Sequence, residues 1–270
     1  MSTTPRGARA HRPARARRRP GPGWVPNQHG AWAMILLPLG VGALHAGARW
    51  WHLLLLVTWL VAYLAFFAAG LWLRAHRRAK YVPAVRAYAV ATALLGTATV
   101  LTAPEPLHLL RWGVVYAPLL AVSLRASWVR ADRSLLNDAV TVLAASLMAV
   151  VAHATVPGPV WLPGGAAEAW ALAAVLLGYF LGTVLYVKTM IRERGNRAMY
   201  LASVGYHAAL VPAALLVSPW LLSPWLAALF AVLAVRAAVV PRAWPTASPR
   251  AVGLGEVAAS VALGLLLLVA

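Results

Sequence analysis

The sequence predicts an all-α membrane protein, a polytopic bundle of about nine transmembrane helices. Hydrophobic residues make up 62% of the 270 residues and charged residues 11%, whereas about a quarter of the residues in a soluble domain are charged. The apolar residues form long continuous runs, without the alternation typical of a transmembrane β-barrel. A helix of ~20 apolar residues can cross a bilayer, and most of these runs approach that length.

Nine runs fit this rule, and each should be a helix because a backbone in lipid has to form its hydrogen bonds internally. The first follows a basic tail without a small-residue cleavage site, so we expect a retained helix and not a signal peptide. The eighth is short. We expect a disordered basic tail over residues 1–23 and one transmembrane domain over residues 24–270. The runs cover residues 31–47, 51–73, 82–103, 107–124, 135–155, 168–187, 198–217, 219–235 and 250–270.

Lysine and arginine lie almost entirely in every second connection between these runs. Seven arginines precede the first run, and the second, fourth, sixth and eighth connections hold five, three, four and three Lys or Arg residues. The odd-numbered connections hold Arg49 and Arg111 alone. Because Lys and Arg gather in cytoplasmic loops, the pattern predicts a multi-pass protein of the cell membrane with its N-terminus in the cytoplasm and its C-terminus outside. The net charge of +18 then faces acidic lipid headgroups, and we expect no nucleic-acid partner.

Few residues offer catalytic chemistry. The chain has no cysteine, and its six acidic residues include no carboxylate pair with metal-ligand spacing. The phosphate-binding motif GxxxxGK[ST], the nucleophile motif GxSxG and the zinc motif HExxH do not occur. We expect neither a metal nor a cofactor, and the sequence identifies no catalytic residue and no oligomeric state.

Three polar clusters lie at the predicted cytoplasmic ends of the helices. The first is Asn27, Gln28 and His29, which directly precede the first run. Polar side chains at this place can cap a helix, but three in a row exceed what a cap needs. The second is Asn137 and Asp138, about one turn inside the fifth run. A carboxylate there should face the bundle interior and find a partner, for which the loop arginines are the obvious candidates, although helix capping alone would also explain the cluster.

The third cluster follows the sixth run. Lys188 and Arg192 are four residues apart and share one helix face, so they are placed to bind a phosphate or carboxylate. Glu193 is spaced to pair with Arg197, and Gly195 can end the helix in a left-handed cap. A basic cytoplasmic loop with internal ion pairs is the alternative interpretation. The candidate ligand-binding residues of this segment are Lys188, Arg192, Glu193, Arg194 and Asn196.

One further candidate is His207, which lies about nine residues into the seventh run. At 1.5 Å per residue this places it ~14 Å along the helix, close to mid-membrane. Ser203 lies one turn earlier on the same face. An intramembrane ionisable residue suggests function, although a histidine that hydrogen-bonds within the bundle is the competing interpretation.

Two of these clusters carry a family resemblance. The segments PNQHGAWAM at 26–34, VKTMIRERGN at 187–196 and YHA at 206–208 resemble the YwiC-like family of bacterial membrane proteins. The resemblance covers most of the chain beyond the basic tail and implies a membrane protein, but it brings no activity with it.

A weaker resemblance, in the number of spans and the polar loops after the second and sixth, is to UbiA-type prenyltransferases. Those enzymes hold Mg²⁺-diphosphate on Asp-rich motifs in the two loops. Here residues 74–86 contain no acid and residues 188–197 contain Glu193 alone, so the Mg²⁺-dependent reaction is not implied.

Three functions remain open. The favoured hypothesis is a binding or catalytic protein whose cytoplasm-facing cavity accepts an amphipathic or isoprenoid-like ligand with an anionic head. The second is a small-solute transporter that uses His207, Asp138 and Glu256 as intramembrane polar steps. The third is a structural assembly factor whose polar clusters serve helix packing.

Overall fold

The computed structural model describes residues 23–26, 31–153, 167–216 and 224–269. Within these residues the chain forms helices and no strands, which confirms the all-α prediction. Two short turns accompany the main helices: η1 (Ala79–Tyr81) is a 3-10 turn and η2 (Lys188–Arg192) is a π-helical turn. The main helices are α1 (Ala31–His45), α2 (Trp50–Arg74), α3 (Val82–Thr102), α4 (Pro106–Trp128), α5 (Leu135–His153), α6 (Ala167–Val187), α7 (Arg197–Leu216), α8 (Pro224–Ala243) and α9 (Pro249–Val269).

Eight of these helices are long and apolar enough to cross a membrane. The exception is α1, whose 15 residues correspond to about 22 Å of helix, less than the ~30 Å hydrocarbon core. The chain is therefore a multi-pass membrane protein, as expected. Proline begins α4, α8 and α9, since the first turn of a helix tolerates a residue without an N–H group.

The predicted bounds of the eighth helix were wrong. We expected residues 219–235, whereas α8 runs from Pro224 to Ala243. Proline fixes the helix start, and the hydropathy rule ended the run at Arg236 because it treated that arginine as a loop charge. The helix instead continues for two further turns, since Arg236 finds an acidic partner inside the bundle.

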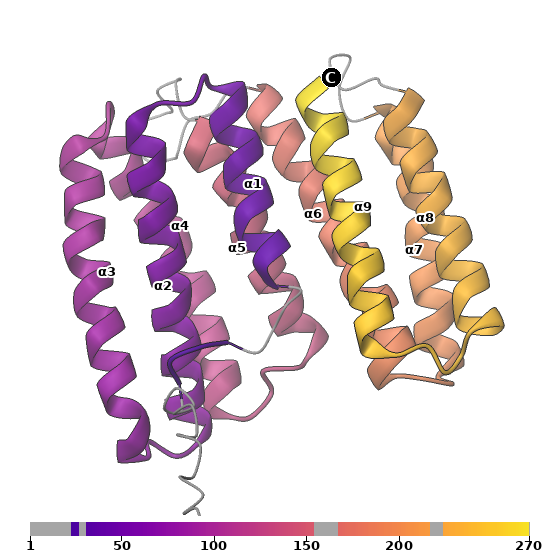
Figure 1. Ribbon diagram of the computed structural model, residues 1–270, viewed down its shortest axis with the longest axis horizontal. Coiled ribbons are helices and arrows are strands. Elements are labelled where there is room, and N and C mark those ends of the chain that lie inside the picture. The colour runs from indigo at the N-terminus through magenta and orange to yellow at the C-terminus, as the bar shows by residue number, and fades with distance from the viewer. Residues whose placement is uncertain (1–22, 27–30, 154–166, 217–223, 270) are drawn as a thin grey trace, which may run out of the picture.

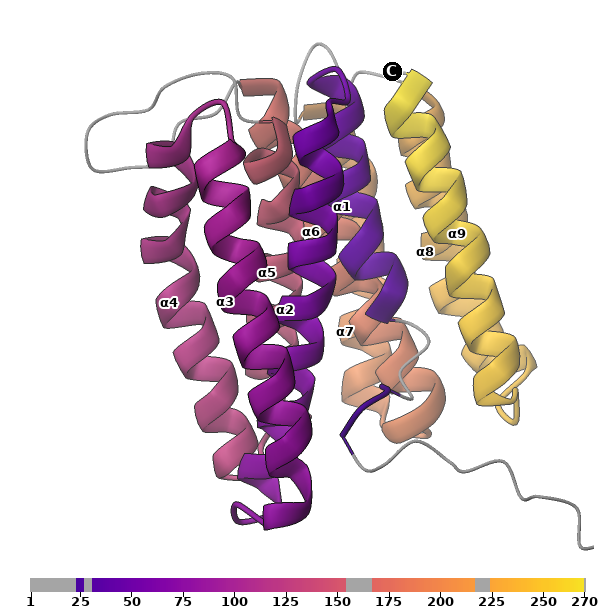
Figure 2. The ribbon, with the colours of Figure 1, turned by 60° about the vertical axis from the view of Figure 1, so that its left-hand side comes forward.

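The helices stand side by side, with α5 and α6 at the centre (Figures 1 and 2). Helices α2, α3 and α4 pack on one side of this centre and α7, α8 and α9 on the other, while α1 contacts α5, α6 and α9. Half of the residues in the most apolar windows of α5 and α6 are buried, against 11% for α2 and α3. The outer helices therefore present most of their apolar surface to lipid.

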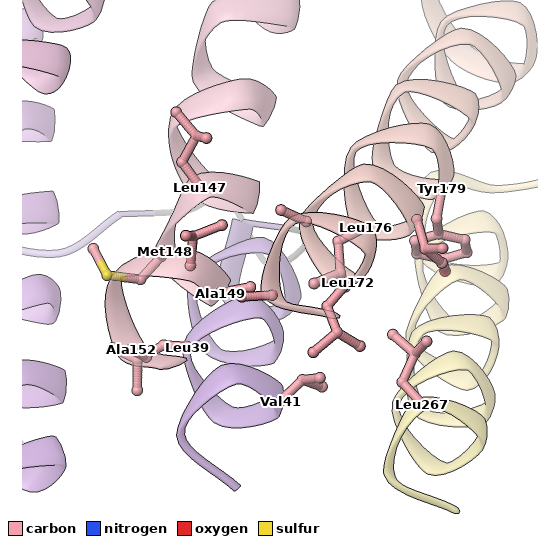
Figure 3. Close-up of a cluster of buried hydrophobic side chains, with 14 of the residues drawn as sticks. Leu39, Val41, Leu147, Met148, Ala149, Ala152, Leu172, Leu176, Tyr179 and Leu267 are labelled. Carbon is pink, nitrogen blue, oxygen red and sulfur yellow. The ribbon is translucent and has the colours of Figure 1, made fainter. Parts of the chain in front are cut away.

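Aliphatic side chains of α1, α5, α6 and α9 form the main core (Figure 3). It is tightest between α1 and α5, where a Cβ atom on Gly42 would overlap the backbone of Ala149. Val41, Leu176 and Leu267 are buried in the same core. The core lies in the half of the bundle where α1, α5 and α9 end.

Successive helices alternate in direction, so the connections after α2, α4, α6 and α8 lie together at one end (Figure 1). These are the connections that carry the Lys and Arg residues. We call this end of the bundle the basic end. The apolar core lies toward the opposite end.

Candidate ligand-binding site at the basic end

Two of the three predicted polar clusters meet at the basic end. The Nζ atom of Lys188, in η2, lies 2.8 Å from Oδ2 of Asp138 in the first turn of α5. The same ammonium donates a hydrogen bond to the carbonyl oxygen of Arg133 at 2.7 Å. Asp138 was expected to pair with a loop arginine, and its partner is instead this lysine. Lys188 is buried, so its charge neutralises Asp138 and is not available as the predicted anion contact.

Asn137 shapes the connection that enters α5. Its Nδ2 atom donates to the carbonyl oxygen of Asp132 at 2.8 Å, and its backbone N–H donates to Oγ of Ser134 at 3.2 Å. Ser134 is therefore a helix cap, as helix-start chemistry predicts. The Oδ1 atom of Asn137 is buried and meets no donor among the described residues.

The segment after α6 is an interrupted helix that hydrogen bonds from Arg194 stabilise. The N–H of Glu193 reaches back five residues to the carbonyl oxygen of Lys188 at 2.7 Å, which makes η2 a π-turn. This leaves the carbonyl oxygen of Met190 outside the helical ladder, and Arg194 donates to it from Nε at 3.0 Å and from Nη2 at 2.8 Å. The same Nη2 reaches the carbonyl oxygen of Ala247, between α8 and α9, at 3.1 Å.

The segment ends at the predicted glycine, but Glu193 has a different partner from the predicted one. Gly195 has φ +83°, a left-handed conformation that glycine adopts without steric cost. Asn196 then caps α7, since its Oδ1 accepts hydrogen bonds from the N–H groups of Ala198 and Met199. Its Nδ2 donates to Oε2 of Glu193 at 3.0 Å. The expected Glu193–Arg197 ion pair is not among the ion pairs of the described residues.

A pocket of about 500 Å³ opens between η2, α7 and α8. Drug-sized ligands occupy pockets of ~300–1,000 Å³. Three arginines and no acidic residue line it, beside the amide of Asn196 and the ring of Tyr200. The ring lies under the guanidinium of Arg242, whose Cζ atom is 4.7 Å from the ring centroid. The remaining walls are largely apolar, and the full lining is Thr189, Met190, Arg194, Gly195, Asn196, Arg197, Tyr200, Leu201, Pro241, Arg242 and Pro245.

The pocket includes part of the predicted site. Arg194 and Asn196 line it, whereas Lys188, Arg192 and Glu193 do not. Sequence reasoning missed Arg242 and Tyr200, because Arg242 lies in the predicted eighth connection and Tyr200 in the seventh run, and nothing in their spacing links them to the third cluster. Asn27, Gln28 and His29 lie outside the described residues.

His207 is buried inside the bundle and does not line the pocket. Its Nδ1 atom lies 2.7 Å from the carbonyl oxygen of Ser203, one turn earlier in α7. Across the helix interface the ring packs on Gly182 of α6, where a Cβ atom would come within 3.0 Å of Nε2. This geometry supports the interpretation of His207 as a residue that joins two helices.

A buried ion pair was not among the predicted site residues. Nη1 of Arg236 in α8 lies 2.8 Å from Oε1 of Glu256 in α9, and Thr183 of α6 donates to Oε2 at 2.9 Å. The guanidinium stacks on Tyr186, with Cζ 4.1 Å from the ring centroid. Glu256 within an apolar run was the sequence signal, since a carboxylate there needs a partner. The pairing of Glu256 with Arg236 was not predicted, because Arg236 was assigned to a loop.

The opposite end has a histidine–carboxylate contact of its own. Nδ1 of His45, at the end of α1, lies 2.7 Å from Oε1 of Glu168 at the start of α6. Nε2 of the same ring lies 2.7 Å from the carbonyl oxygen of Leu267 in α9. His153 of α5 approaches the other oxygen of Glu168 at 3.9 Å. This contact joins the helices that enclose the apolar core.

The comparisons with known proteins agree with the sequence motifs. A family model described as "YwiC-like protein" matches residues 25–153, which correspond to α1 through α5 with the short segment before α1. The chain is 34% identical to the uncharacterized protein YwiC of Bacillus subtilis, over 69% of this chain and 74% of that one. The chain belongs to the YwiC-like family. An uncharacterized protein of Haemophilus influenzae is 28% identical over 68% of this chain and 74% of its own length.

No solved structure matches this YwiC-like protein. The suggested likeness to UbiA-type prenyltransferases is therefore not confirmed, and membership of the YwiC-like family is what the comparisons show.

Proposed function

We propose that this YwiC-like protein binds an amphipathic ligand with an anionic head in the pocket at the basic end, and that this end faces the cytoplasm. The observation that carries the proposal is the lining of the pocket, with three arginines, no acid and largely apolar walls. Guanidinium groups bind phosphate and carboxylate through paired hydrogen bonds. An isoprenoid-like or acyl tail would then lie against the apolar walls and in the surrounding lipid.

The three arginines have different roles in this proposal. Arg194 already donates to two backbone carbonyl oxygens, so it mainly holds the pocket wall. Arg197 and Arg242 form no ion pair within the described part of the chain, so their guanidinium groups are the proposed contacts of the head. Lys188 is not a proposed contact of the head, because Asp138 neutralises its charge.

The orientation and the domain limits are parts of the same proposal. The basic connections support a cytoplasmic basic end, with the C-terminus outside. One transmembrane domain over residues 24–270 with a basic tail before it, and a contribution of Asn27, Gln28 and His29 to the site, stay predictions. The transporter hypothesis has less support, because aliphatic side chains fill much of the bundle toward the opposite end.

The test uses the purified full chain in a neutral detergent, with farnesyl diphosphate and short-chain phosphatidic acid as anionic probes and short-chain phosphatidylcholine as the neutral one. We expect an anionic probe to raise the unfolding temperature. The double variant Arg197→Gln/Arg242→Gln should lose most of this stabilisation. The charge-matched control Arg86→Gln/Arg250→Gln removes two exposed arginines outside the pocket and should keep it. Equal stabilisation of both double variants would reject the pocket as the site.

A second measurement identifies the natural ligand. Lipids that copurify with the wild-type protein are compared with those of the Arg197→Gln/Arg242→Gln variant by mass spectrometry. An enriched anionic lipid that the variant loses would support the proposal. Identical lipid profiles, together with no response to the probes, would contradict it.

A further inference from the structure

Helices α2 and α4 come together at the basic end, on the side of the bundle away from the pocket. The approach is close near their ends, where a Cβ atom on Gly70 would lie 3.1 Å from Oγ of Ser127. Both helices end within the next few residues, at Arg74 and Trp128. The connections that follow them are therefore neighbours.

The two helix ends close with the same hydrogen-bond pattern. The N–H of Arg77 donates to the carbonyl oxygen of Trp72 at 2.8 Å, and the N–H of Ala131 donates to that of Ala126 at 2.7 Å. Both bonds span six residues, as in the Schellman motif. That motif places the residue before the donor in the left-handed region, and His76 (φ 53°) and Arg130 (φ 60°) occupy these positions.

Glycine is the usual residue at such a position, because a Cβ atom raises the conformational free energy there. This chain instead has a histidine and an arginine at the two caps, and Arg77 follows at φ 61°. A basic side chain near one helix C-terminus is favoured by the helix dipole. The dipole explains one such residue at each helix, but it does not explain why the side chains of the two caps meet.

The side chains do meet, through a hydrogen bond. Nη2 of Arg130 donates to Nε2 of His76 at 2.6 Å, so this imidazole nitrogen is the acceptor. The guanidinium of Arg77 stacks on the ring of Trp128, with Cζ 4.5 Å from the ring centroid. The nearby Asp132 is already bound to Arg74 at 2.8 Å. Five exposed basic residues gather here, and we call them the double-cap patch: His76, Arg77, Arg78, Lys80 and Arg130.

We propose that the double-cap patch binds the phosphate of an acidic phospholipid headgroup, in the leaflet at the basic end. An anion would offset the repulsion among the four exposed cations Arg77, Arg78, Lys80 and Arg130, and arginine fits phosphate with paired hydrogen bonds. The depth also fits a headgroup, because Trp128 is 54% exposed and tryptophan prefers the membrane–water interface. This proposal is independent of the pocket, which lies between η2, α7 and α8.

The left-handed backbone provides a sharp test. Arg77→Gly/Arg130→Gly removes two cations and places glycine where glycine is favoured, so the variant should fold with unchanged or higher stability in phosphatidylcholine nanodiscs. Binding of phosphatidylglycerol, titrated into these nanodiscs and counted by native mass spectrometry, should weaken roughly thirtyfold, since each arginine near the surface contributes about a factor of five. The control Arg86→Gln/Arg250→Gln loses the same charge outside the patch and should bind nearly as the wild type does.

Three results would overturn the proposal. One is phosphatidylglycerol binding by the double glycine variant that equals that of the control. Another is displacement of bound phosphatidylglycerol by soluble glycerol phosphate at matched ionic strength, which would identify a free phosphate ester and not a membrane headgroup as the ligand. A double glycine variant that unfolds in phosphatidylcholine would show that the side chains hold the two caps together, and it would reject a patch built for lipid.

Discussion

The Nζ atom of Lys188 lies 2.8 Å from Oδ2 of Asp138, so one ion pair joins the π-turn after α6 to the first turn of α5. The lysine also donates to the carbonyl oxygen of Arg133. It thereby links the half of the chain that the family model matches, residues 25–153, to the half that carries the pocket. Lys188, which the sequence suggested as a ligand contact, instead connects the two halves of the chain.

Replacing Lys188 by methionine tests the contribution of this ion pair to stability. The change leaves the Asp138 carboxylate without its partner, while that side chain is 23% exposed. Breaking a buried pair costs 3–5 kcal/mol and partial exposure reduces this, so we expect a loss of about 2 kcal/mol in the free energy of unfolding. Arg192→Met is the matched control, because Arg192 forms no ion pair within the described residues. Equal unfolding curves for the two variants in a detergent titration would contradict a stabilising role of the Lys188–Asp138 ion pair.

The contact of Lys188 with Asp138 also shows how much of the structure could be predicted from the sequence. Apolar runs located the nine main helices of the described residues, because lipid imposes helical hydrogen bonding on any apolar segment of sufficient length. Charge alternation placed Lys188 and Asp138 at the same end. It could not pair them, since either one had several oppositely charged candidates and the choice depends on how α5 and α6 pack. The same packing hid Arg236, which hydropathy assigned to a loop although Glu256 holds it inside the bundle.

The contact of Gly182 with His207 predicts a second outcome. A Cβ atom on Gly182 would lie 3.0 Å from Nε2 of the buried ring, so Gly182→Ala requires the ring or its helix to shift by a few tenths of an ångström, and the ring contacts the carbonyl oxygen of Ser203 through Nδ1. Overpacking of this kind costs ~1–3 kcal/mol. Gly205→Ala in α7 meets no atom within 4 Å and should instead stabilise the helix by about 0.5–1 kcal/mol. Thermal unfolding in one detergent separates the variants, and a stabilised Gly182→Ala would disprove the contact.

A third prediction concerns the core between α1 and α5. Gly42→Ala would drive a Cβ atom into the backbone of Ala149, and a backbone cannot move aside as a side chain can. We expect a loss of about 3 kcal/mol or more, at the upper end for overpacked cores. Gly40→Ala in the same helix has no atom within 4 Å of its new Cβ and should be tolerated. Comparable folded yields for the two variants after membrane extraction would argue against the close approach.

The Arg236–Glu256 pair makes the fourth prediction, and a double-mutant cycle is the measurement. Nη1 of Arg236 lies 2.8 Å from Oε1 of Glu256, beside the hydroxyl of Thr183 and the ring of Tyr186. Arg236→Gln leaves a buried carboxylate and should lose about 3–5 kcal/mol, while Glu256→Gln leaves a guanidinium that is 18% exposed and should lose about 2–3 kcal/mol.

In the Arg236→Gln/Glu256→Gln double variant no charge remains buried, and the two amides can hydrogen-bond to each other. We expect it to recover much of the stability that either single variant loses, with a coupling energy of about 2 kcal/mol or more. Such recovery would show that the penalty arises from the unpaired charge and not from lost packing around α8 and α9. Additive losses in the cycle would mean that the two residues act separately, and the ion pair would then not be the reason that α8 continues past Arg236.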